Sequence, residues 1–88
     1  MKATKTFKIG EYAIGGIIKV DISGQVLAIK ALDWNSKKEV LNGSFTADES
    51  DARLNVFNFL NELTSSYYSD KIIQWIESKI ELNKNGRW

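Results

Sequence analysis

Two β-rich runs joined by a short glycine-containing turn constrain the fold of this chain more than any other feature. The runs cover residues 16–22 and 25–34, and Ser23-Gly24 is a suitable two-residue hairpin loop between them. This loop predicts a register in which Ile22 faces Gln25 and Val20 faces Leu27. Because side chains alternate between the faces of a strand, one face of the hairpin is almost purely apolar. Its members are Ile18, Val20, Ile22, Leu27, Ile29 and Ala31.

Further strands are predicted on both sides of this hairpin. Phe7 and Ile9 alternate with Lys8, which indicates a short N-terminal strand. Residues 39–45 indicate a return strand, with Leu41 and Phe45 on the apolar face.

The second half of the chain has the periodicity of helices. Apolar residues recur at helical spacing over Asp51 to Leu63 and again over Asp70 to Leu82. Residues 64–69 interrupt the pattern, so Ser69 or Asp70 is expected to cap the second helix. We therefore predict an α+β fold, in which an antiparallel sheet of three or four strands is followed by two C-terminal helices packed on one face.

A length of 88 residues predicts a single domain, 1–88. Within it, 1–45 is expected to be mainly strands, 46–83 two helices and 84–88 a tail. The start of the sequence lacks the apolar segment of a secretory signal, and no apolar run is long enough to span a bilayer. These features predict a cytoplasmic protein that does not bind membranes.

The residue types present argue against catalysis. The chain has no histidine and no cysteine, so the commonest general base and the commonest zinc ligands are missing. We expect no catalytic residues, no metal site, no cofactor and no enzyme activity. Asp48, Glu49 and Asp51 are interpreted as the acidic start of a helix in preference to a metal site. Asp33 and Glu39 are interpreted as surface acids in preference to a catalytic pair.

The face of the hairpin opposite the apolar one is the predicted partner-binding surface. It combines large apolar residues with lysines, namely Trp34, Leu32, Val26, Ile17, Lys19 and Lys30. If no other element covers this face, its apolar members form a patch of the kind that marks a partner site. The alternative is that the N-terminal strand or the Arg87-Trp88 tail covers it. Tyr67 and Tyr68 are candidates either for the edge of the core or for a binding anchor.

The order of elements resembles that of small phage-encoded anti-CRISPR inhibitor proteins. The elements that carry the resemblance are the hairpin from Ile17 to Trp34, the return strand from Glu39 to Phe45 and the two short helices. The resemblance implies a protein that occupies a surface of a nuclease complex. We therefore predict a non-catalytic protein-binding module that inhibits a host defence complex, as a monomer or a homodimer.

A nucleic-acid-binding protein is the alternative function. Residues 1–38 carry seven lysines and three acids, whereas residues 39–88 carry five basic residues and eight acids. The half of the chain that forms the sheet is therefore basic, which favours contact with phosphates.

Overall fold

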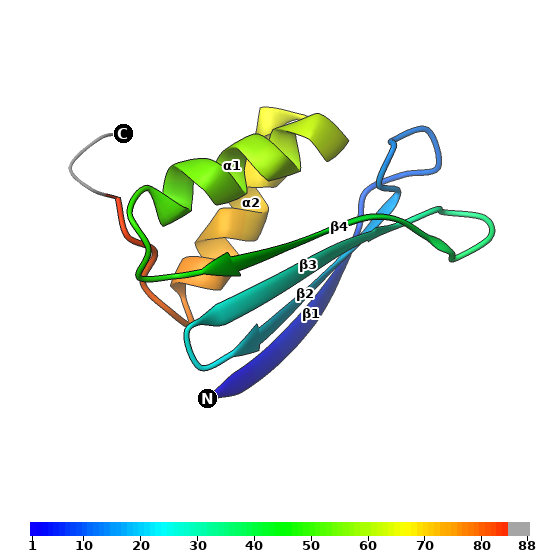
Figure 1. Cartoon of the computed structure of the whole chain (residues 1–88). Coiled ribbons are helices and arrows are strands. Elements are labelled where there is room, and N and C mark those ends of the chain that lie inside the picture. Colours follow the sequence, from blue (N-terminus) through cyan, green and yellow to red (C-terminus); the bar gives the residue numbers. More distant parts are fainter. Residues whose placement is uncertain (85–88) are drawn as a thin grey trace.

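The protein contains one four-stranded antiparallel sheet in which neighbours in sequence are also neighbours in space (Figure 1). The computed structural model describes residues 1–84. The strands are β1 (Lys2–Lys8), β2 (Ile17–Ser23), β3 (Val26–Leu32) and β4 (Glu39–Thr46). Strands β1 and β4 form the two edges of the sheet.

Two helices, α1 (Ala52–Leu63) and α2 (Ser66–Glu77), follow the sheet. Both lie over the same face, which we call the inner face, and neither of them covers the other side of the sheet (Figure 1). The predicted α+β fold, with a four-stranded antiparallel sheet followed by two C-terminal helices, is confirmed.

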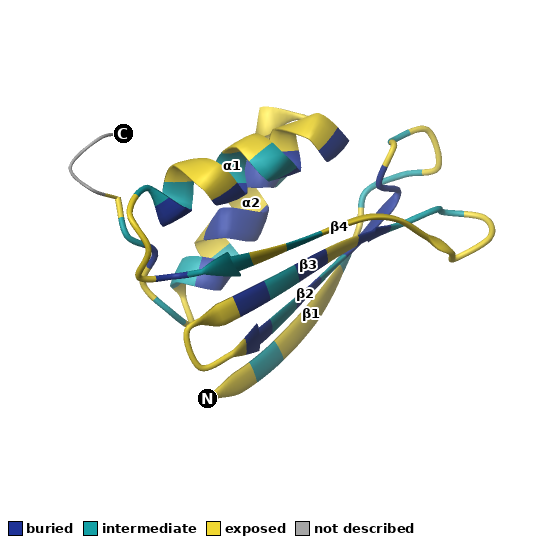
Figure 2. Cartoon of the chain, viewed as in Figure 1, coloured by how far each residue is buried: buried dark blue, intermediate teal, exposed yellow. Residues whose placement is uncertain are grey.

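The core lies between the inner face and the helices (Figure 2). The six apolar residues that the sequence placed on one face of the hairpin are all buried in it. They meet side chains from the two helices, which include Val56, Leu60, Leu63, Ile72, Ile73 and Ile76. Phe45 also packs against the core, with its ring 5.3 Å from that of Phe59. Leu41 lies on the inner face opposite Ala31 but is 39% exposed.

The register of the central hairpin differs from the prediction by two residues. Ile22 lies opposite Leu27 and Val20 opposite Ile29, so the loop is Gly24-Gln25 and not Ser23-Gly24. Gly24 adopts a φ of 61°, a conformation that glycine reaches without steric cost. The observed register pairs apolar residues with apolar residues and places Gln25 in the turn. A shift of two residues keeps every side chain on its predicted face, because the period of a strand is two.

The second helix begins earlier and ends earlier than predicted. It starts at Ser66, with Ser65 as N-cap in an extended conformation, instead of at Asp70. Ser69 is a buried residue inside the helix, and its hydroxyl donates a hydrogen bond of 2.7 Å to Asn61 Oδ1. At the other end the helix stops at Glu77, five residues before Leu82.

The segment after α2 returns to the start of α1. Leu82 is buried in the core, and the Asn83 N–H donates a 2.8 Å hydrogen bond to the Ala47 carbonyl. The Asn83 carbonyl accepts a 3.1 Å hydrogen bond from the Arg53 N–H. These backbone contacts require the chain to leave the helical path after Glu77, which the apolar periodicity alone does not reveal.

Candidate protein-interaction surface

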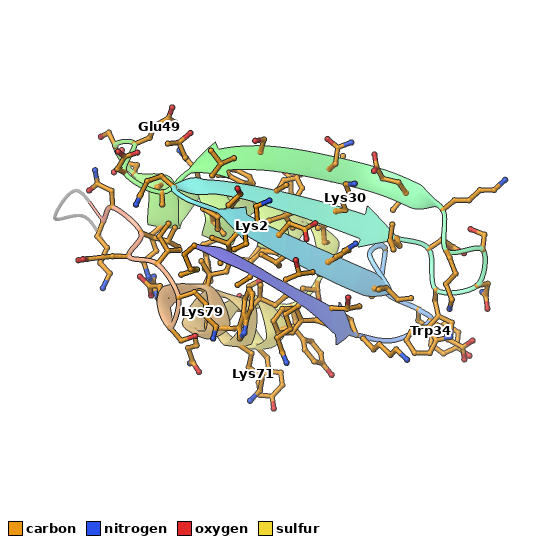
Figure 3. The ribbon with its side chains drawn as sticks, turned by 90° about the horizontal axis from the view of Figure 1, so that it is seen from below. Lys2, Lys30, Trp34, Glu49, Lys71 and Lys79 are labelled. Atoms are coloured by element: carbon orange, nitrogen blue, oxygen red, sulfur yellow. The ribbon has the colours of Figure 1, made fainter. Side chains whose placement is uncertain are left out.

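Among residues 1–84, no element covers the outer face of the sheet, the side away from the helices (Figure 3). Strand β1 lies beside β2 as an edge strand and does not cover this face. The other predicted cover, Arg87-Trp88, lies outside the described residues. The register arranges the outer side chains in rows that cross all four strands. The central rows are Thr4, Asp21, Ala28 and Ser44, then Thr6, Lys19, Lys30 and Asn42.

The four apolar residues of the predicted site do not form one patch. Ile17 is only 5% exposed, which corrects the expectation that it lies open on this face. Leu32 lies opposite Ile17, and both Leu32 and Trp34 are half-buried. Val26 is 46% exposed, but six residues of strand, or about 20 Å, separate it from Leu32. The apolar side chains therefore sit at opposite ends of the sheet, with lysines between them.

Trp34 is fixed by the turn that joins β3 to β4. Asp33 Oδ2 accepts hydrogen bonds from the backbone N–H groups of Asn35 and Ser36, at 3.0 and 2.8 Å. Both bonds lower the pKa of the Asp33 carboxyl, and the bond from the Ser36 N–H has the largest effect. Desolvation of the carboxyl acts in the opposite direction and is weaker than the effect of Ser36. Lys37 Nζ donates to the Trp34 carbonyl and lies 5.4 Å from the centre of its ring. The turn thus holds Trp34 at the loop end of the sheet.

Lys19 and Lys30 form the centre of the outer face. They lie directly opposite each other on β2 and β3, and like charges in this position are destabilising. Among the described residues, neither lysine takes part in a salt bridge. Their neighbours in the row are Thr6 and Asn42, which carry no charge. Two adjacent ammonium groups that form no salt bridge within residues 1–84 can bind an anionic group from outside the protein.

The sequence interpretation missed the contribution of β1 to this face. Lys2 and Lys8 lie on the same side as Lys19, so that four lysines and two acids, Asp21 and Glu39, share the outer face. Asp21 is already engaged, because it accepts a 2.6 Å hydrogen bond from the Thr4 hydroxyl. In the sequence, the spacing of Lys2, Thr4, Thr6 and Lys8 indicates that their side chains share one face of a strand. Polar residues at this spacing are a weaker indication of a strand than apolar residues at the same spacing.

The acidic residues considered as catalytic or metal-binding candidates either form hydrogen bonds within the protein or lie apart from one another. Glu39 Oε2 accepts a hydrogen bond from the Asn42 side chain, and Asp33 is held in its turn. Asp51 is the N-cap of α1, although its side chain makes no capping hydrogen bond. Within residues 1–84, no group of three acidic side chains is placed to hold a metal ion.

A pocket of about 430 Å³ lies where β4 leads into α1. Its lining combines Ala47 and Leu82 with the polar residues Gln25, Asp48, Glu81, Asn83 and Lys84. Since Leu82 and Asn83 are tied to the core and to Ala47, we assign this pocket to the packing of the C-terminal segment.

The two tyrosines have different environments. They lie in the first turn of α2, where Tyr67 is 63% exposed and Tyr68 is half-buried. Their rings form an edge-to-face pair with centroids 5.2 Å apart.

Comparisons with known proteins assign this chain to no group. A scan against models of protein families, a search of curated proteins and a search of solved structures each found no match. The resemblance to phage-encoded inhibitors therefore stays a prediction. Within the part of the chain that the structure describes, no helix is long and apolar enough to cross a membrane.

Proposed function

We propose that this chain is a non-catalytic module that binds an acidic surface of another protein through the outer face of its sheet. The observation that carries the proposal is the pair Lys19 and Lys30, which lie side by side at the centre of the outer face and form no salt bridge with any residue of 1–84. A protein that keeps a destabilising like-charge pair gains from it when a partner supplies the missing negative charge. Lys2 and Lys8 extend the positive charge to the β1 side of the face.

The composition of the face favours a protein over a nucleic acid. Proteins that bind single strands usually stack bases on exposed aromatic rings, and the outer face positions on β1 to β4 carry none. The net charge of +1 is also small for a protein that binds a polyanion by charge alone. Hydroxyl groups and exposed Val26 suit the mixed polar and apolar contacts of a protein interface.

The proposal includes inhibition of a host defence complex as the biological role. The nucleic-acid channel of a nuclease is positively charged, so this lysine face is not complementary to it. The docking surface on such a complex is therefore an acidic one outside the channel. This distinguishes the proposed mode of action from mimicry of DNA, which requires an acidic inhibitor.

Capture from a lysate of the source organism tests the proposal. Immobilised wild-type chain is expected to retain a protein that survives nuclease treatment and is lost in the variant Lys19→Glu with Lys30→Glu. The matched control is Lys38→Glu with Lys84→Glu, which changes the net charge equally at exposed positions outside the strands. Capture that depends on nucleic acid would favour the alternative function. Equal capture by both variants would contradict the role of the outer face.

A further inference from the structure

We infer that the free edge of β1 binds an extended acidic segment of the partner as a fifth strand of the sheet. This inference rests on the proposed function and specifies how the partner is held. It requires three features of the β1 edge: unused backbone groups, a complementary lining on α2 and a positive charge. Each is present among the described residues.

The backbone of β1 offers hydrogen-bonding groups to a further strand. The Ile9 N–H donates to the Gly16 carbonyl at 2.8 Å, and the Gly24 N–H donates to the Met1 carbonyl at 2.9 Å. In an antiparallel ladder, the residues that bond to the neighbouring strand alternate with residues that face away from it. The odd-numbered residues of β1 therefore bond to β2. The even-numbered residues, Lys2, Thr4, Thr6 and Lys8, turn their N–H and C=O groups to the free edge.

Helix α2 lines this edge on the inner side of the sheet. Trp75 contacts β1, with its ring 6.1 Å from that of Phe7 in an edge-to-face arrangement. Helical spacing places Tyr68 and Lys71 in the same row of α2 as Trp75, and Lys79 follows in the turn directly after the helix. Figure 3 shows Lys71 of α2, and Lys79 from the turn after it, on the side of the molecule next to the β1 edge. An added strand would therefore have aromatic and basic side chains along its inner side.

The positive charge of the β1 edge and of the adjacent part of α2 favours an acidic strand as the binding partner. Lys2, Lys5 and Lys8 are the charged residues of β1, Lys71 is the charged residue of the facing row of α2, and Lys79 follows just after the helix. No carboxylate belongs to either set. Lysines on an edge strand discourage pairing with a second copy of the same chain, since two β1 strands would bring six lysines together. That role explains the lysines of β1 but not Lys71 and Lys79, whereas an acidic strand is attracted by both groups of lysines.

Hydrogen exchange with a defined peptide tests the inference. The probe is a capped seven-residue peptide of alternating Glu and Val, which matches the seven residues of β1 and favours an extended conformation. On binding, the backbone amides of Thr4 and Thr6 are expected to become protected from exchange. The amides of Lys5 and Phe7 already bond to β2 and serve as internal references. Absence of binding, or binding that leaves Thr4 and Thr6 unprotected, overturns the inference.

Variants of both molecules separate pairing from charge. Two methylated peptides are compared, one with methyl groups on the backbone nitrogens of all Val residues and one with them on those of all Glu residues. Both keep the charge of the peptide. If the peptide adds as a strand, alternate N–H groups bond to β1, so one of the two methylated peptides must fail to bind. Replacement of Lys71 and Lys79 by Glu is expected to weaken binding about tenfold, as two reversed contacts predict. The control with Lys38 and Lys84 replaced by Glu should bind normally. Binding by both methylated peptides, or an equal effect of the control, contradicts strand addition.

The outcome for the edge is distinguishable from the outcome for the outer face. Binding that is lost on replacing Lys19 and Lys30 by Glu, without protection of Thr4 and Thr6, supports the outer face and overturns strand addition. Protection of these two amides in a complex that is insensitive to Lys19 and Lys30 supports strand addition and contradicts the role of the outer face.

Discussion

Replacement of Lys30 by Glu should stabilise the protein while weakening its binding to a partner. Lys30 lies directly opposite Lys19, at a Cβ separation of about 5 Å for cross-strand neighbours. Two charges about 7 Å apart in water repel each other by about 0.6 kcal/mol. The substitution turns this repulsion into an attraction of similar size, so the free energy of unfolding should rise by about 1 kcal/mol. For a domain of this size, the melting temperature should increase by about 4–8 °C.

Thermal melts at low and high ionic strength provide the assay. The gain should be largest at low salt and should shrink at 1 M salt, where the Debye length is about 3 Å. Lys38→Glu is the control, because it makes the same change in net charge on the β3–β4 turn. A decrease in stability for Lys30→Glu, a gain equal to that of the control or a gain unaffected by salt would refute the reasoning.

Three further predictions concern the fold. Leu27→Ala should lower the free energy of unfolding by about 2–5 kcal/mol in denaturant titrations, because Leu27 is fully buried; a wild-type midpoint would place it outside the core. Gly16→Ala should cost about 1–3 kcal/mol, because its Cβ would lie 2.8 Å from Trp34 Cβ and 2.9 Å from the Gly10 carbonyl; unchanged melting would contradict this packing. Asp33 has a lower pKa in the folded protein, so its stabilising effect is present above the unfolded pKa of about 3.9 and is lost as the pH falls through the folded value; an NMR titration midpoint at or above 3.9 would contradict this.

The fold was predictable because its apolar residues follow simple periods. Alternation in β2 and β3 defined the inner face even though the loop was misplaced, since Gly24 serves the turn equally well as its first or second residue. The first and last residues of α2 were predicted less accurately. Tyr67 and Tyr68 interrupt the apolar pattern in the first turn of α2, so the start of the helix was predicted too late. The end was predicted too late because the hydrogen bond between Asn83 and Ala47, which accompanies the change of path after Glu77, joins distant parts of the sequence.

The candidate site was predictable in part. Lys19 and Lys30 were correctly placed on the outer face, because period-two alternation is independent of the exact register. The burial of Ile17, which lies between Lys8 and Leu32 in the sheet, was not predicted, because alternation gives the face of a side chain and not its exposure. The free β1 edge also required the structure, because strand order alone determines which strand has an unpaired side.

Lysine labelling of the complex tests the central claim most directly. The wild-type chain would be acetylated with limiting reagent, alone and bound to its captured protein partner, and modification at each lysine measured by mass spectrometry. We predict that labelling of Lys19 and Lys30 falls in the complex, whereas labelling of Lys38 and Lys84 remains unchanged. Unchanged labelling of Lys19 and Lys30 in a saturated complex would contradict a partner site on the outer face of the sheet.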